Sequence, residues 1–399
     1  MERIEELKNQ AARQVGQMKS DLFHISDWLY DHPELGSEEH KSAEYLSAYL
    51  RRNGFKIAKG IAGIPTAFAA SKGRDSPKIA FLAEYDALPG IGHGCGHNLI
   101  ASAAVGAAVA VGKVLNQIKG AVLVIGTPDE EGRGKYAGSK SLLAKAGIFS
   151  DIDAVLMTHG APRYSVGGQA LAVRDLIMTF EGRTAHAAAS PERGINALDA
   201  AVLTYVAVNT LRQHVRRDAN VVIHGIIAEG GKASNVIPDR ALLKYGARSS
   251  DTKYVHNLIE RMKKCAKGAA VATGATVTFS SNMPMYEGIR HNTVLEDLIA
   301  KNLRELGVRI QDPAETRKEM PRASTDFGNV THVVPAASLS MKICGPNVAG
   351  HSIQFRDATK TSQGRKGLMT ATKAMAMTAV ELMADRVLLN KIRKASRAR

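Results

Sequence analysis

The stretch that decides the fold is Lys78–His97, which reads KIAFLAEYDALPGIGHGCGH. Its first part, Lys78–Tyr85, is a short and nearly continuous apolar run of the length expected for a buried strand. Asp86 follows directly, and Gly94-Cys95-Gly96-His97 comes a few residues later. Ligands of open α/β sheets bind outside the carboxyl ends of the strands, so this stretch predicts a buried strand that runs into a functional site.

Three further apolar runs repeat this pattern, and an Ala-rich helical pattern at residues 98–115 lies between the first run and the next. The three runs are residues 121–127, 154–158 and 337–343. Strands that alternate with helices predict a mostly parallel sheet covered on both faces. We expect a final helix from Ser362 to Leu389.

The middle of the chain follows a β-α-β-β-α-β order, which is the ferredoxin-like plan. Three of its four strands are expected at 171–180, 219–227 and 241–247, with a helix at 194–215 and a second helix that Asp251 or Thr252 could cap. We therefore predict an α/β protein. Its catalytic domain would comprise residues 1–171 and 286–399, and residues 172–285 would form an inserted α+β domain.

Composition restricts the class of protein and its location. With 399 residues and 45% apolar side chains, the chain is long enough for two domains. The three cysteines are odd in number and widely spaced, which argues against a disulfide framework and predicts a cytoplasmic location. The acidic start is unlike a secretory signal, and residues 101–112 are too short a stretch to span a bilayer.

The formal charge of +15 comes partly from the tail at residues 386–399. One interpretation is binding to nucleic acid or to another acidic surface. The other is a solvated helix end and a frayed terminus. Because no aromatic residues interleave the basic ones, base stacking has no support, and we do not expect a nucleic-acid partner.

Each predicted sheet strand leads into polar side chains that are able to bind metal. These are Asp86, Cys95 and His97 after the first strand, Glu130 and Glu131 after the second, His159 after the third, and His351 after the fourth. Thiolate, imidazole and carboxylate groups are ligands of zinc, and they are also compatible with manganese, cobalt or nickel. We therefore predict that distant segments form a metal centre at one edge of the sheet.

Each of these residues also has a plainer interpretation. Cys95 alone could be a small buried hydrophobe. The Glu130-Glu131 pair could be an exposed acidic turn, although adjacent side chains point different ways, so one carboxylate could bind metal while the other holds the attacking water. His186, in the inserted domain, would by sequence logic alone more often be structural than catalytic.

Asp86-Ala87-Leu88-Pro89 followed by Cys95-Gly96-His97-Asn98 resembles the aminoacylase/carboxypeptidase family of dinuclear metallopeptidases. The match is nearer to its amidohydrolase branch, which includes indole-acetyl-amino-acid hydrolases, and is nearest to the dipeptidase and p-aminobenzoyl-glutamate hydrolase subgroup. The resemblance covers nearly the whole chain and includes residues 31–36, 182–187, 230–238, 324–330 and 351–352.

The resemblance implies a role for each site residue. Cys95 would bridge two divalent ions, zinc or manganese foremost, and the other ligands would be His97, Glu131, His159 and His351. Glu130 would be the general base, and Asp86 would orient a ligand. In a homodimer or higher oligomer, the inserted domain would serve as lid and dimerisation domain, and His186 would stabilise the oxyanion in the partner's active site. Asn235 and Arg248 would contact the substrate, Arg248 at its carboxylate, although Arg248 could instead be a surface residue of its strand.

Three positions depart from the pattern of the family: Asp129, Arg133 and the segment 160–162. None of them removes a proposed ligand. The function that we predict is metal-dependent hydrolysis of a small amide, such as an N-acyl amino acid, a dipeptide or an aminobenzoyl-glutamate-like compound. The alternatives are an amidase with Cys95 as nucleophile and His97 as base, and a non-catalytic binder of acidic partners.

Overall fold

The computed structural model describes residues 2–321 and 323–397. The described chain divides into two compact units. The large unit comprises residues 2–169, 289–321 and 326–397, and the small unit comprises residues 170–288 and 323–325. Each unit has its own hydrophobic core, so each is described by itself.

The large unit contains a seven-stranded sheet in the order β1-β2-β4-β3-β5-β11-β6. Its strands are β1 (Lys56–Lys59), β2 (Phe68–Gly73), β3 (Lys78–Ala83), β4 (Ala121–Gly126), β5 (Ala154–Ala161), β6 (Ser165–Val166) and β11 (Ala336–Lys342). The four central strands pair in parallel, and the pairings at both edges are antiparallel. The predicted α/β fold is therefore confirmed as a mixed, mostly parallel sheet, although the sequence analysis missed β1, β2 and β6.

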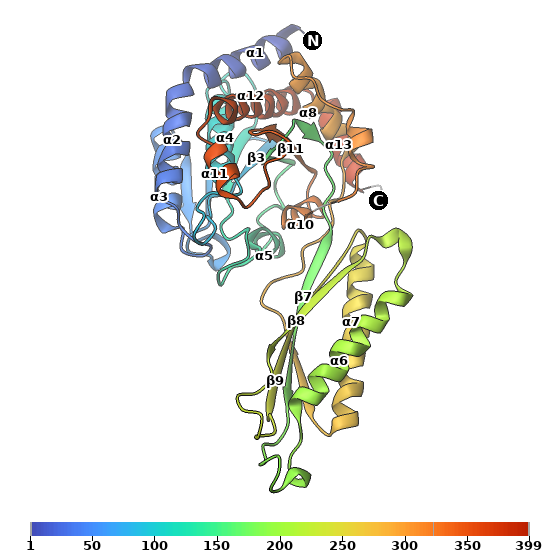
Figure 1. The fold of residues 1–399 in the computed structure, drawn as a ribbon. Helices are drawn as coiled ribbons and strands as arrows, with labels where there is room; N and C mark the ends of the chain where they lie inside the picture. Colours follow the sequence, from blue (N-terminus) through green and yellow to red (C-terminus); the bar gives the residue numbers. More distant parts are fainter. Residues whose placement is uncertain (1, 322, 398–399) are drawn as a thin grey trace. The chain divides into compact units, whose positions relative to one another are not determined.

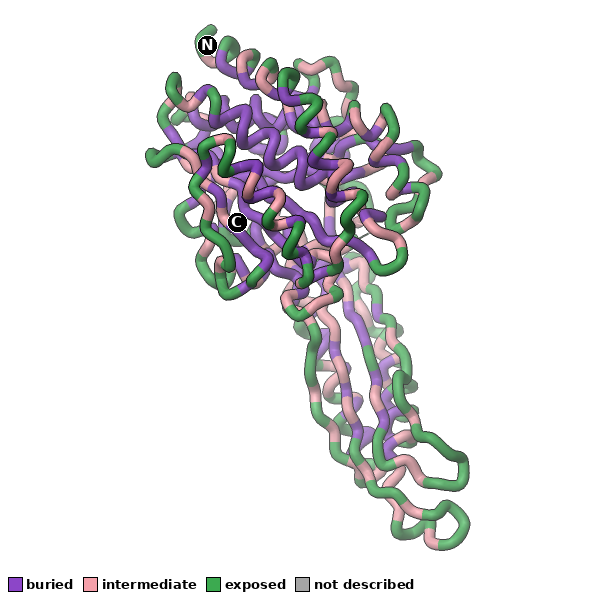
Figure 2. The backbone as a smooth tube through the Cα atoms, turned by 90° about the vertical axis from the view of Figure 1, so that its left-hand side faces the viewer, coloured by how far each residue is buried: buried purple, intermediate pink, exposed green. Residues whose placement is uncertain are grey.

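Helices enclose this sheet, and Figure 2 shows the buried segments concentrated within the unit. They are α1 (Glu2–Gln17), α2 (Lys19–Asp31), α3 (His40–Arg52), α4 (His97–Gly112), α5 (Ser139–Lys145), α8 (Thr293–Glu305), α9 (Pro313–Thr316), α10 (Phe327–Thr331), α11 (Ile353–Ala358), α12 (Ser362–Ala384) and α13 (Arg386–Arg397). Every residue of α4 is buried. Small side chains make this close packing feasible: a Cβ added at Gly106 would lie 2.6 Å from Leu22 of α2, so a larger residue there would force the helices apart.

The small unit is a four-stranded antiparallel sheet in the order β10-β7-β9-β8, with both of its helices on one face (Figure 1). Its elements are β7 (Ala172–Glu181), α6 (Ala197–Leu211), β8 (Val222–Glu229), β9 (Arg240–Ser249), α7 (Thr252–Thr273) and β10 (Thr276–Ser280). They follow one another in β-α-β-β-α-β order. Asp251 caps α7, because its side chain accepts a hydrogen bond from the backbone N–H of Tyr254 at 3.1 Å.

The C-terminal region differs from the sequence-based expectation in two ways. The single helix expected at residues 362–389 is interrupted at Asp385, whose side chain accepts a hydrogen bond from Leu388 N and so starts a new helix, α13. The expectation of a frayed terminus is also wrong for the described residues. Leu389 and Ile392 on α13 are fully buried, because their spacing of three places both on one face of the helix.

Asn292 fastens α13 to the rest of the large unit, and this contact can be tested. Its side-chain oxygen caps α8 at Leu295 N, and its amide nitrogen donates 2.8 Å hydrogen bonds to Ile392 O and Ser396 Oγ. We expect Asn292→Ala to lower the free energy of unfolding by about 1–3 kcal/mol, measured by urea denaturation, because the cap is lost and a buried carbonyl loses its donor. Ser396→Ala leaves the cap intact and should cost less. An unchanged urea midpoint for Asn292→Ala would contradict this role.

None of the helices formed by the described residues combines the length and the apolar character needed to cross a bilayer.

Candidate metal centre

The five predicted metal ligands come together in the large unit. Cys95 and His97 lie in the loop after β3 and at the first residue of α4, and Glu131 follows β4. His351 lies in the loop after β11 and has a φ of +58°, a strained backbone conformation of the kind found at functional sites. One placement needs correction: His159 was expected to follow its strand but lies within β5, which continues to Ala161.

The ligand atoms form two groups that share Cys95. Cys95, His97 and His159 place one donor atom each within 4.8 Å of one another, and Cys95, Glu131 and His351 do the same. Cys95 Sγ lies 3.4 Å from His159 Nε2, and Glu131 Oε1 lies 3.4 Å from His351 Nε2. These separations fit side chains that surround a common ion at bond lengths of about 2.0–2.3 Å. The thiol of Cys95 is therefore common to both groups of donor atoms.

Hydrogen bonds behind the cluster orient two of the imidazoles. His97 Nδ1 lies 2.9 Å from the backbone oxygen of Asp86 and 3.0 Å from its Oδ1. His159 Nδ1 lies 2.8 Å from the backbone oxygen of Gly160. Both Nδ1 atoms therefore act as donors, so Nε2 is the ring atom that each imidazole directs at the cluster and that could bind a metal once it has lost its proton.

The buried polar atoms of the cluster fit a bound cation. His97 Nε2 and Glu131 Oε1 are buried and have no hydrogen-bond partner among the described residues. His97 Nε2 faces another electron-pair donor, Glu84 Oε2, at 3.4 Å. A buried polar atom without a hydrogen-bond partner is costly, and a divalent ion bound to His97 Nε2 and Glu131 Oε1 would remove that cost. The residues present therefore suit a metal centre.

Electrostatics favours the thiolate form of Cys95. Burial alone would raise the pKa of this thiol, but the charge of His159 beside it and hydrogen bonds from the neighbouring imidazoles hold that pKa well below its usual value. Burial and the charge of Glu84 raise the pKa of Glu130 to about 8. Burial and the charge of Cys95 raise the pKa of Glu131 to about 8 as well. A thiolate is the form that binds metal, and a carboxylate with a pKa near neutrality is suited to proton transfer.

A buried charge network that the sequence analysis missed lies behind Glu130. Lys140 Nζ lies 2.7 Å from Glu84 Oε1 and also contacts Asp326 Oδ1, and all three side chains have no exposed surface. Glu84, Glu130 and Asp326 place one oxygen each within 4.8 Å of one another. The one local signal was Glu84 itself, a charged residue within an apolar strand pattern.

Asp129, which departs from the family pattern, shapes the loop that carries Glu130 and Glu131. It is buried and has a φ of +53°. Its Oδ1 accepts hydrogen bonds from Arg133 N at 2.9 Å and Gly134 N at 3.0 Å. Its own backbone N–H donates to the buried Glu39 at 2.8 Å. The departure at Asp129 is therefore accommodated as a structural element of this loop.

The other three predicted site residues lie in the small unit. His186 is exposed, and its Nδ1 accepts hydrogen bonds from Ala188 N at 3.2 Å and Ala189 N at 3.1 Å. The ring therefore presents Nε2–H as a donor. Asn235 lies beside this loop, since its backbone oxygen accepts a hydrogen bond from Ala187 N. Arg248, on β9, donates to Ser324 Oγ at 3.2 Å.

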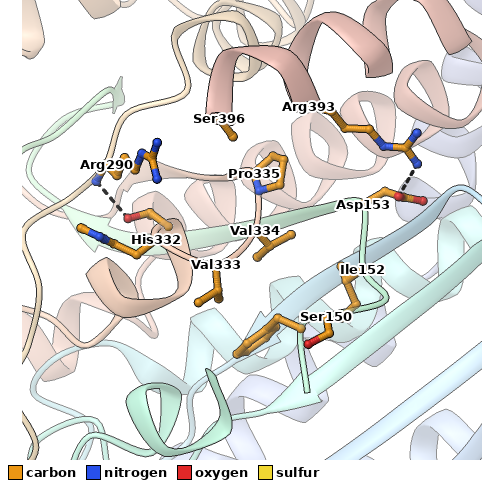
Figure 3. A pocket seen from close by; sticks show the side chains of 12 residues that line it. Ser150, Ile152, Asp153, Arg290, His332, Val333, Val334, Pro335, Arg393 and Ser396 are labelled. Carbon is orange, nitrogen blue, oxygen red and sulfur yellow. Dashed lines mark hydrogen bonds and ion pairs between the residues drawn. The ribbon is translucent and has the colours of Figure 1, made fainter. Parts of the chain in front are cut away.

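A cavity of about 610 Å³ in the large unit contains none of the predicted site residues. Figure 3 shows that its walls are the two segments that precede β5 and β11 and, on another side, helix α13. Its polar groups include Arg290, His332 and Arg393, which is paired with Asp153. The cavity lies at the amino-terminal ends of β5 and β11, whereas the ligand cluster lies towards the carboxyl ends of the strands. The cavity therefore takes no part in the chemistry proposed for that cluster.

Comparisons with known proteins identify the family. Residues 80–383 match the model of peptidase family M20/M25/M40. The chain is 34% identical to the Xaa-Arg dipeptidase of Mus musculus over 98% of this chain and 92% of the relative. It is 32% identical to one of the subunits of the p-aminobenzoyl-glutamate hydrolase of Escherichia coli K12, over 92% and 89% of the two chains.

Solved structures show the same fold. A dinuclear metal-binding peptidase of the M20 family from Bacillus subtilis superposes with a TM-score of 0.68 at 21% identity, over 92% of this chain and 99% of that one. An aminobenzoyl-glutamate utilization protein from Klebsiella pneumoniae gives a TM-score of 0.73 at 20% identity, over 93% and 98%. The resemblance seen in the sequence motifs is thus confirmed. The chain belongs to peptidase family M20/M25/M40 and is a metal-dependent hydrolase of amide bonds.

Proposed function

We propose that this protein hydrolyses a small amide that carries a free carboxylate: an N-acyl amino acid, a dipeptide or an aminobenzoyl-glutamate-like compound. The observation that carries this proposal is the pair of donor groups that share Cys95, with Glu130 beside them. The names of the relatives, a dipeptidase and an aminobenzoyl-glutamate hydrolase, support the class of substrate.

Cys95, His97 and His159 would hold one ion, and Cys95, Glu131 and His351 the other. Sulfur and imidazole donors suit zinc, and the carboxylates also suit manganese, so these are the metals that we propose. When bound, the ions polarise a carbonyl and lower the pKa of water from 15.7 to about 7 in favourable single-zinc sites. Asp86 fixes His97 through Nδ1 and also accepts a 2.9 Å hydrogen bond from Glu131 N, so it orients two of the ligands.

Glu130 is the proposed general base. One carboxylate oxygen takes a proton from the attacking water, and the protonated acid then gives that proton to the leaving nitrogen. His186 Nε2–H donates a hydrogen bond to the carbonyl oxygen as negative charge develops on it. Arg248 would pair with the substrate carboxylate, because a guanidinium matches a carboxylate in shape and charge, and Asn235 would provide a further polar contact.

The register of the small unit supports action of His186 across two subunits. The loop of His186 follows Glu181, which pairs with Arg240 at the start of β9. Arg248 lies eight residues further along β9, which at about 3.3 Å per residue places it about 26 Å away. A small substrate cannot span that distance, so His186 and Arg248 at one active site would come from different subunits.

The small unit also presents a surface suited to a second copy of the chain. β8 is an edge strand, and it exposes Ile226 at 60% and Ile227 at 39%. The helix α6 of the same unit exposes Leu203 at 46% and Val206 at 56%. An exposed apolar edge strand and exposed apolar residues on a helix favour association. We therefore propose a homodimer formed through this lid and dimerisation unit.

Removal of the metal tests this proposal directly. Dialysis against a chelator should abolish hydrolysis of the best substrate in a screen of N-acyl amino acids, dipeptides and p-aminobenzoyl-glutamate. Addition of Zn²⁺ or Mn²⁺ should restore it, because the water and the carbonyl regain their activation. A control incubated in buffer alone should keep its activity.

The same experiment separates the competing functions. An amidase that uses Cys95 as nucleophile would keep its activity after chelation. A protein that hydrolyses no substrate in the screen with any added metal, yet shows salt-sensitive binding to nucleic acid, would be a non-catalytic binder.

The three cysteines are free thiols, which is typical of a reducing compartment, so a cytoplasmic location is part of this proposal.

A further inference from the structure

The mechanism proposed above leaves a buried cation beside Glu130 without a role. Lys140, on α5, has no exposed side-chain surface and contacts two carboxylates that are equally buried, Glu84 and Asp326. Asp326 is held a second time, because its Oδ2 accepts a 3.0 Å hydrogen bond from Lys140 N. A fully buried ammonium is retained only where carboxylates and hydrogen bonds compensate for its lost hydration, so this residue is part of a built arrangement.

The position of the ammonium is informative. Glu84, Asp326 and Glu130 place their oxygens within 4.8 Å of one another, close enough to hold a metal ion, and Lys140 Nζ binds two of these three. The second oxygen of Glu84 lies 3.4 Å from His97 Nε2, a proposed ligand atom. Glu130 Oε2 lies 3.9 Å from the same nitrogen, so Glu84 and Glu130 both border the metal centre, and Lys140 holds Glu84 from the other side through Oε1.

We propose that Lys140 is a positioning residue: its ammonium occupies the place of a third cation, holds Asp326 and one oxygen of Glu84 away from the metal centre, and so keeps Glu130 directed at the attacking water. This inference rests on the proposed function of Glu130, and it assigns Lys140 no contact with the substrate. Oxygen-rich clusters bind divalent ions readily. Loss of the ammonium would therefore open a competing ion site that draws Glu130 away from the reaction.

The test compares Lys140→Met, which removes the charge at similar length, with Lys145→Met, an exposed lysine on the same helix. Metal content is measured by mass spectrometry after equilibration with Mn²⁺. The number of Mn²⁺ ions bound per chain should rise from about two in the wild type to about three in Lys140→Met. Its kcat should fall roughly 100-fold with little change in KM, because the base is misplaced while the substrate contacts remain. Lys145→Met should match the wild type in both measurements.

The double variant Lys140→Met/Asp326→Asn should return to about two ions, since one of the three carboxylates is gone. Two ions and an unchanged kcat in folded Lys140→Met would overturn the proposal. If Lys140→Met does not fold, Asp326→Asn keeps the test open: the freed ammonium should then pair with Glu130 and lower kcat with two ions still bound. A lower melting temperature with unchanged kcat would mean a structural role alone and would overturn the proposal. If the wild type hydrolyses nothing, the proposed function fails while the ion counts still decide the role of Lys140.

Discussion

The variant Glu130→Gln is expected to fold, to keep both divalent ions and to lose roughly a hundred- to ten-thousand-fold in kcat. Glutamine has the size and shape of glutamate but cannot accept a proton from water. Glu130 belongs to neither of the two donor groups that share Cys95, so its replacement should leave both ion positions intact. Single-turnover kinetics and metal analysis of the purified variant measure the two expected effects.

The adjacent residue supplies a contrast. Glu131 belongs to the group with Cys95 and His351, so Glu131→Gln should lose metal as well as activity. Glu130 also lies within 4.8 Å of donor atoms of His97 and Glu131, which gives a competing assignment of Glu130 as a ligand. Loss of an ion from Glu130→Gln would support that competing assignment. Full activity with both ions would remove the general-base role. Glu260→Gln, at an exposed position on α7, serves as a surface control.

The sequence was sufficient to predict that the candidate ligands lie close together, because of a geometric property of parallel sheets. Cys95, Glu131 and His351 are far apart in the chain, yet each follows a strand of the parallel centre, and the carboxyl ends of such strands meet at one edge. His159 joins them through the parallel register, in which it pairs with Ser340 of β11. The role of each residue as a ligand, in contrast, is implied by the resemblance to the metallopeptidase family.

Features that depend on particular tertiary contacts were beyond the reach of the sequence. Lys140 is one of many lysines, and its role depends on contacts with Glu84 and Asp326, which lie 56 residues before it and 186 after it. The helix α13 was missed for a different reason. Its basic composition suggested a solvated end, but burial of two apolar residues on one face outweighs exposed charge in fixing a helix.

The variant His186→Ala is expected to lose roughly a hundred- to a thousand-fold in kcat, the usual cost of removing one oxyanion donor, while it keeps both ions. The structure supports a donor role, because Ala188 N and Ala189 N occupy Nδ1 and so fix the proton on Nε2. His256→Ala, at an exposed position of the same unit, should behave as the wild type. Near-normal turnover of His186→Ala would exclude the oxyanion role.

A mixture of the two inactive variants tests whether the donor acts across subunits. A dimer of one Glu130→Gln chain and one His186→Ala chain contains one site in which both residues are intact, provided that His186 serves the partner's active site. After unfolding and refolding of an equal mixture, about a quarter of wild-type activity should return, since random association makes half of the dimers mixed and completes one site in each. If His186 serves its own subunit, neither site of the mixed dimer is complete and no activity returns. The recovered activity therefore decides between the two arrangements.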